Sequence, residues 1–97
     1  MVAYWVAAIG TDDPDGIKGY SQRAPAAVAK YGGKFLSKVG RFKLLEGALA
    51  GDRVALIEFE SMEKAVACYN SPEYQEALSY RAGKAEAVFF VVDGTEE

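Results

Sequence analysis

The clearest strand candidates in this chain are apolar on both faces. They are Val2–Ile9, Val54–Phe59 and Ala87–Val92. A sheet with one face in water alternates apolar and polar residues, whereas the first and last of these segments contain no regular polar position. The pattern therefore predicts a sheet that is covered on both faces.

Two helical regions are predicted between the strands. The first begins at Thr11–Pro14, which supplies a capping residue and a proline at the first helical position, and it ends at Gly32-Gly33. The second begins after Ser61 and restarts at Ser71-Pro72, where a serine again precedes the helix as its cap. Apolar residues recur along both regions at spacings of three and four, so each region has one face that packs against a sheet.

One further strand is expected between the helical regions. It covers Lys34–Val39, has a bulge or bend at Gly40 and continues over Phe42–Leu45. A glycine-rich hairpin over Gly47–Asp52 then leads into the strand that contains Val54–Phe59 and begins at Arg53.

The element order is therefore βαββαβ, with a last strand at Glu86–Val92 and a short acidic tail at Asp93–Glu97. This order predicts one α+β domain over residues 1–97, with a four-stranded antiparallel sheet and the first and third strands in its middle. Both helical regions lie on the same face of this sheet. We therefore expect a second copy of the chain to cover the other face in a homodimer.

Charge and composition exclude several classes of partner. The chain has 97 residues, of which 51% are hydrophobic, and a net charge of −3, so it does not attract nucleic acid or an anionic membrane in general. No apolar run approaches the roughly 20 residues that span a bilayer, and no cleavable basic segment precedes the first strand. The single cysteine, Cys68, cannot form an internal disulfide, which fits a reducing compartment. We expect a soluble, unprocessed, cytoplasmic protein.

The sequence contains no histidine, and this restricts its chemistry. A haem with a proximal histidine, a zinc site built on imidazole and a Ser-His-Asp triad all lack the side chain they need. Electron transfer and metal carriage lack their cysteine and histidine ligands as well. We expect no metal and no cofactor, so that any proton transfer falls to a carboxylate, lysine, tyrosine or the thiol.

Glu58 is the candidate catalytic residue. It lies between two apolar residues of a central strand, and a carboxylate buried there needs a hydrogen bond, a counter-ion or a proton. In a functional role it acts as a general base or a ligand anchor, with Arg53, Arg41 or Arg81 as its partner. The alternative is a structural salt bridge across the dimer interface, close to the strand end.

The candidate ligand-binding residues are aromatic and basic: Trp5, Tyr20, Arg53, Tyr74 and Arg81. Tyrosines on the helical stripes point toward the sheet, and such a cluster is either ordinary core or the wall of a pocket for a flat apolar molecule. Arginine clamps carboxylates bidentately, but at strand and helix ends it commonly faces water or an ion pair. A functional pocket is predicted to enclose several hundred Å³ between helices and sheet and to contain one carboxylate and at least one tyrosine hydroxyl.

Several short motifs together resemble one family. They are Tyr4-Trp5-Val6, Thr11–Pro14, Ala24-Pro25, Tyr31–Leu36, Leu45-Glu46-Gly47, Arg53, Ile57-Glu58-Phe59 and Ser71–Gln75. With these motifs the chain is similar to the bacterial proteins grouped as domain of unknown function 1330, in the dimeric α/β-barrel superfamily. The resemblance implies a ferredoxin-like monomer whose sheet packs on that of a second monomer, and it implies no particular activity.

Two functions remain open. The first is a homodimeric small-molecule-binding domain, with or without cofactor-free enzymatic activity on a small aromatic or carboxylated metabolite. The second is a non-catalytic dimerisation or interaction module. A pocket that contains a carboxylate and a tyrosine hydroxyl favours the first, and a space filled by side chains favours the second.

Overall fold

The elements follow one another in the predicted order in the computed structural model, which describes residues 1–49 and 51–95. They are β1 (Ala3–Gly10), a 3-10 turn (Asp15–Ile17), α1 (Lys18–Lys30), β2 (Lys34–Lys38), β3 (Arg53–Phe59), α2 (Met62–Tyr69), α3 (Pro72–Ser79) and β4 (Glu86–Asp93). The fold is the ferredoxin-like βαββαβ arrangement that the sequence predicts.

The four strands form one antiparallel sheet in the order β2-β3-β1-β4, so the first and third strands are central as predicted. Trp5 pairs with Ile57 on β3 and with Val91 on β4, and these side chains share the face toward the helices. Because side chains alternate along a strand, Tyr4 and Glu58, which pair with each other, lie on the opposite face.

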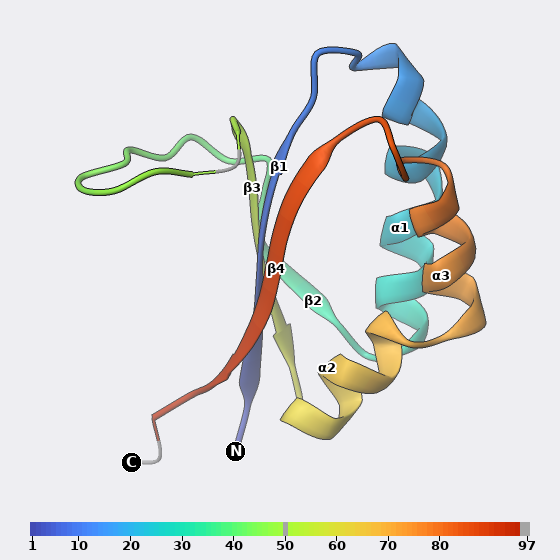
Figure 1. The fold of residues 1–97 in the computed structure, drawn as a ribbon. Helices are drawn as coiled ribbons and strands as arrows, with labels where there is room; N and C mark the ends of the chain where they lie inside the picture. The colour runs from blue at the N-terminus through green and yellow to red at the C-terminus, as the bar shows by residue number, and fades with distance from the viewer. Residues whose placement is uncertain (50, 96–97) are drawn as a thin grey trace.

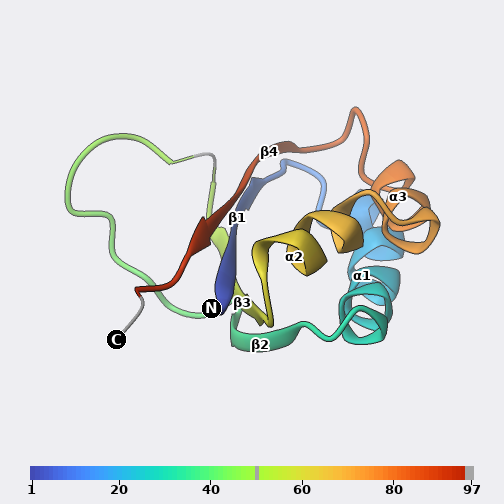
Figure 2. The ribbon, with the colours of Figure 1, turned by 90° about the horizontal axis from the view of Figure 1, so that it is seen from below.

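All three helices cover one face of the sheet (Figure 1), and the view from below shows α1, α2 and α3 on the same side (Figure 2). We call the other side the helix-free face. Its residues from the two central strands and β4 include Tyr4, Val6, Leu56, Glu58, Val88, Phe90 and Val92. Val88, Phe90 and Val92 are 51%, 53% and 47% exposed, so the face is apolar and uncovered in the single chain.

Residues 39–49 form an arm instead of a strand, and the predicted continuation over Phe42–Leu45 is wrong. β2 ends at Lys38, and Val39 then adopts a positive φ of 50°, which turns the chain out of the sheet. The bulge lies between Phe35 and Ser37 instead of at Gly40. The predicted hairpin Gly47–Asp52 and the predicted tail Asp93–Glu97 include residues 50 and 96–97, which lie outside the described residues.

The helix starts follow from local capping. The carboxylate of Asp13 accepts a hydrogen bond from the Gly16 N–H at 3.0 Å, and this holds a 3-10 turn ahead of α1 at the start predicted from the sequence. Ser61 and Ser71 cap α2 and α3 as predicted, with their hydroxyl oxygens accepting the N–H groups of Lys64 and Tyr74.

The core between sheet and helices is rich in aromatic residues. The Trp5 indole stacks on Phe59 with ring centroids 5.6 Å apart and meets the Tyr74 ring edge-on at 5.1 Å. All three side chains are fully buried, so this cluster fixes α3 over the middle of the sheet. Within the described residues, no helix is long and apolar enough to cross a membrane.

Candidate functional site

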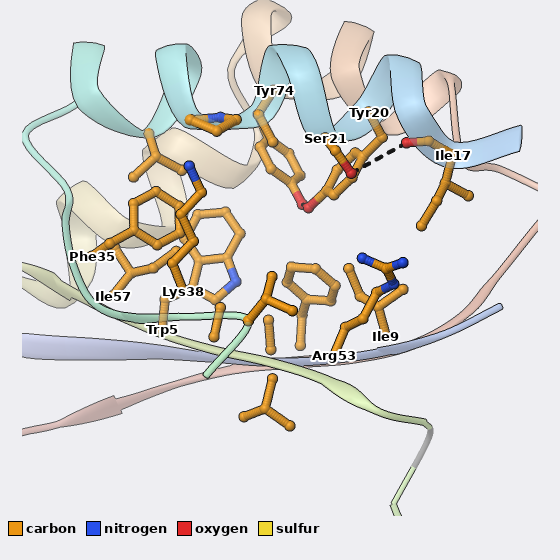
Figure 3. A pocket seen from close by; sticks show the side chains of 18 residues that line it. Trp5, Ile9, Ile17, Tyr20, Ser21, Phe35, Lys38, Arg53, Ile57 and Tyr74 are labelled. Carbon is orange, nitrogen blue, oxygen red and sulfur yellow. Dashed lines mark hydrogen bonds between the residues drawn. The ribbon is translucent and has the colours of Figure 1, made fainter. Parts of the chain in front are cut away.

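A cavity of about 100 Å³ lies between the sheet and α1 (Figure 3). Its floor is the helix-facing side of β1, β2, β3 and β4, and its roof is formed by α1 with Tyr74 from α3. Ala7, Ala24 and Ala55 line it, and their short side chains leave the space that larger residues would fill. The lining is almost entirely apolar, and the cavity is smaller than the several hundred Å³ expected from the sequence.

Two tyrosine hydroxyls meet on the helix side of the cavity. The Oη atoms of Tyr20 and Tyr74 are 2.6 Å apart in a buried hydrogen bond. Burial raises the pKa of both tyrosines, and for Tyr74 the nearby Tyr20 raises the pKa further. Both phenols are therefore protonated at neutral pH, and because one proton makes their mutual bond, the pair keeps a second proton for another acceptor.

The indole of Trp5 forms part of the opposite wall. The residue is 1% exposed, and its Nε1 atom is buried without a hydrogen-bond partner in the part of the chain that the structure describes. In Figure 3 the indole nitrogen lies on the side of the ring nearest the centre of the cavity. A buried N–H without an acceptor costs about 1–3 kcal/mol, so this donor is available to a guest with an acceptor atom.

Two cations flank the cavity. Lys38 lies at the end of β2, with its ammonium nitrogen 5.2 Å from the centroid of the Phe35 ring, and Arg53 lies at the start of β3. Figure 3 shows these two side chains on different sides of the cavity, Lys38 toward Phe35 and Arg53 toward Ile9. Both residues nevertheless come from the same end of the sheet, where β2 ends and β3 begins, and we call this end of the cavity the charged end.

Arg81 packs against Tyr20 from outside the cavity lining. Its guanidinium carbon is 4.8 Å from the ring centroid of Tyr20 and equally 4.8 Å from that of Phe89, a cation–π arrangement on both sides. The residue is 7% exposed, and its Nε atom has no hydrogen-bond partner within residues 1–49 and 51–95. Among the described residues, no carboxylate lies within ion-pair distance of it.

The structure brings together most of the predicted ligand-binding residues. Trp5, Tyr20, Arg53 and Tyr74 line the cavity, and Arg81 contacts Tyr20 from outside the lining. Glu58, the predicted catalytic residue, does not line the cavity, because its register opposite Tyr4 places it on the helix-free face. The expectation of a carboxylate in the pocket is therefore wrong for the described lining.

Lys38 and Phe89 also line the cavity, although the sequence pattern predicts neither of them as a site residue. Strict alternation along β2 places Lys38 on the face opposite Phe35, but the bulge between Phe35 and Ser37 turns it to the same face. Phe89 lies in a run of six apolar residues in β4, where no polar position shows which side chains face the helices. The pairing of Phe89 with Ala7 shows that the Phe89 side chain faces the helices.

The described lining suits binding more than proton abstraction. Its polar groups are two protonated phenols, an indole N–H, a serine and two cations, and none of these is a strong base at neutral pH. Within the described residues, no group of histidine, cysteine, aspartate and glutamate is arranged to hold a metal ion.

Comparisons with known proteins agree with the fold. A family model described as "Domain of unknown function (DUF1330)" matches residues 2–95. Among curated proteins the chain has no match.

Solved structures share the fold at low identity. A protein of unknown function from Rhodopseudomonas palustris aligns with a TM-score of 0.69 and 18% identity, over 99% of this chain and 84% of that chain. SnoaB, a cofactor-independent oxygenase from Streptomyces nogalater, aligns with a TM-score of 0.65 and 11% identity, over 99% and 95% of the two chains. A dimeric protein of unknown function with a ferredoxin-like fold from Bacteroides fragilis aligns with a TM-score of 0.63 and 14% identity, over 96% of each chain.

Proposed function

Because this chain belongs to the DUF1330 family, whose description states no activity, we propose a function from its geometry: it is a homodimer in which each subunit binds one small, single-ring molecule. The observation that carries the proposal is an apolar cavity whose wall contains a buried donor, Trp5 Nε1, with no hydrogen-bond partner among the described residues. Ligand sites are typically apolar concavities with a few placed polar groups, and this cavity has that composition.

The size of the cavity limits the guest. An engineered apolar cavity of about 150 Å³ holds benzene. The cavity of this protein, at about 100 Å³, can therefore hold a single ring if its side chains move slightly, but it is too small for a fused polycyclic molecule. Aromatic walls from Trp5, Tyr20, Tyr74 and Phe89 favour a flat guest, because rings pack edge-on and offset against each other.

The homodimer is supported by the helix-free face. Phe90, Val88 and Val92 are about half exposed there, and an apolar sheet face of this kind in water is a typical interaction surface. The Bacteroides fragilis protein with the same fold is dimeric. A second sheet placed on this face would cover these residues and leave the cavity, on the other side of the sheet, free to bind ligand.

Cofactor-free turnover of the bound ring is a finer form of the same proposal. SnoaB, which shares the fold, is a cofactor-independent oxygenase, and this likeness extends to the fold alone. A reaction here would have to use the tyrosine pair, Lys38 or the substrate itself for proton transfer, because Glu58 lies on the opposite face of the sheet.

A non-catalytic dimerisation module is the second candidate. The small volume of the cavity and the lack of a carboxylate among its described lining residues favour it, and the apolar helix-free face suits it equally well. In that case the cavity is a packing defect and binds no ring with useful affinity.

Ligand binding separates the two candidates. Trp5 is the only tryptophan and lines the cavity, so its fluorescence reports occupancy directly. We expect benzyl alcohol, benzamide or benzoate to change this fluorescence saturably. Ala24→Leu, which fills the cavity from α1, should weaken binding at least tenfold, whereas Ala26→Leu at an exposed position of the same helix should not. Absence of saturable binding by all three probes would leave the dimerisation module as the function.

A further inference from the structure

The polar groups around the cavity have one feature in common, namely that they donate hydrogen bonds or carry positive charge. Trp5 contributes an N–H, the tyrosine pair a hydroxyl proton, and Lys38 and Arg53 contribute cations. The hydroxyl of Ser21 already donates to the Ile17 carbonyl at 3.4 Å. No carboxylate is among the described lining residues, so the cavity lacks an anionic acceptor of its own.

The two interior donors line the same cavity, the indole of Trp5 from the sheet side and the tyrosine pair from the helix side. The Trp5 and Tyr74 rings meet edge-on with centroids 5.1 Å apart, so the indole N–H and the phenol pair border the same space (Figure 3). The indole Nε1 has no acceptor, and the tyrosine pair has one proton more than its mutual hydrogen bond uses. A guest that supplies two acceptor oxygens close together would satisfy both.

Arg81 places an uncompensated positive charge next to these donors. Its guanidinium is sandwiched between the rings of Tyr20 and Phe89, both of which line the cavity. It is more than nine-tenths buried, its Nε lacks an acceptor, and none of the ion pairs among the described residues includes it. A buried charge is normally paired, so a negative charge placed in the cavity would be stabilised across the Tyr20 ring.

We propose that the ligand of this cavity is a single-ring carboxylate whose carboxylate oxygens accept hydrogen bonds from Trp5 Nε1 and from the Tyr20–Tyr74 hydroxyl pair. Arg81 is a positioning residue, which orients Tyr20 and balances the charge of the ligand without lining the cavity. The ring occupies the apolar part of the cavity between β1, β3 and α1. This inference rests on the proposed ligand-binding function and specifies its chemical class.

The competing arrangement reverses the ligand. In it the carboxylate lies at the charged end between Lys38 and Arg53, and the ring points inward. The two arrangements differ in which substitutions remove the preference for an anion. They therefore predict opposite outcomes for Tyr20→Phe and Lys38→Met.

The test compares benzoate with benzamide, which have nearly the same shape and differ in charge. Dissociation constants are measured by Trp5 fluorescence for the full chain and for Tyr20→Phe, Arg81→Gln and Lys38→Met. We expect the unmodified protein to bind benzoate at least tenfold more tightly than benzamide. Tyr20→Phe and Arg81→Gln should reduce this ratio at least fivefold, because they weaken benzoate binding more than benzamide binding, whereas Lys38→Met should leave most of the ratio in place.

The ratio is a readout that a purely structural role would not change, because loss of packing weakens both probes alike. Benzamide binding with no preference for benzoate would overturn the inference and leave the binding function intact. A preference that is lost in Lys38→Met and kept in Tyr20→Phe would place the carboxylate at the charged end and overturn it too. Failure of both probes to bind would overturn the binding function itself. The comparison in the unmodified protein stands even if Arg81→Gln does not fold.

Discussion

At the scale of single residues, Cys68 is a buried packing residue of α2. Its side chain is fully buried, with Sγ 3.9 Å from the Ala27 carbonyl oxygen of α1. Burial raises the pKa of the thiol from 9.0 to about 11. Since the thiolate is the reactive form, the folded protein has about 100-fold less of it at neutral pH than an unfolded chain.

We therefore expect a thiol-specific disulfide reagent to label Cys68 at pH 8 at least 100-fold more slowly in the native protein than in urea. The same shift fixes a pH dependence of stability. Because folding raises the pKa, the free energy of unfolding should be independent of this group below pH 9 and should fall between pH 9 and about pH 11. Cys68→Ala, measured by urea unfolding across that range, should lack this decline. Rapid labelling of the native protein would contradict the burial of Cys68.

At the scale of elements, the arm of residues 39–49 is the part of the chain that the fold of one subunit leaves unexplained. It carries several large apolar side chains in contact with water, and Leu45 is 84% exposed. The arm projects to the side of the sheet opposite the helices, as both views show (Figures 1 and 2). This is the side on which we propose that a second subunit lies, so the arm is placed to contact it.

Leu45→Ala should therefore weaken self-association about tenfold or more, because it removes apolar contact with the other subunit. Lys43→Ala, a truncation of a polar side chain in the same arm, serves as the control and should have little effect. Sedimentation equilibrium at several concentrations measures both. Equal dimer dissociation constants for Leu45→Ala and the unmodified protein would show that the tip of the arm stays in water.

At the scale of the whole molecule, the sheet separates two surfaces for which we propose different roles. The ligand cavity lies on the helix side, and the apolar helix-free face lies on the other. Ligand binding and dimerisation can thus be disrupted independently, one from each side of the sheet.

Phe90→Asp tests the dimer directly. It places a charge at a half-exposed position midway along β4 on the helix-free face, where a second sheet would bury it without a partner. We expect a monomer at micromolar concentration by sedimentation equilibrium. Val66→Asp, at a similarly exposed apolar residue of α2, should remain dimeric. A dimeric Phe90→Asp protein would rule out this face as the interface.

The order, number and approximate bounds of the elements could be predicted from the sequence, because local rules set them. Serine caps at Ser61 and Ser71 and the helical spacing of Tyr20 and Ala24 specify their structure within a few residues of chain. Trp5, Tyr20 and Tyr74 could be grouped as a candidate site because large apolar side chains on one helical face must meet the sheet.

The sequence by itself determined the fold class, the two-sided apolar sheet and the aromatic wall of the site. Only the tertiary structure decided that Lys38 lines the cavity, that Glu58 does not, and that Arg81 is buried without a carboxylate partner among the described residues. The physical reason is that the face of a strand residue depends on register, and one bulged residue reverses it. Ion pairing likewise depends on groups far apart in the chain, which local patterns do not bring together.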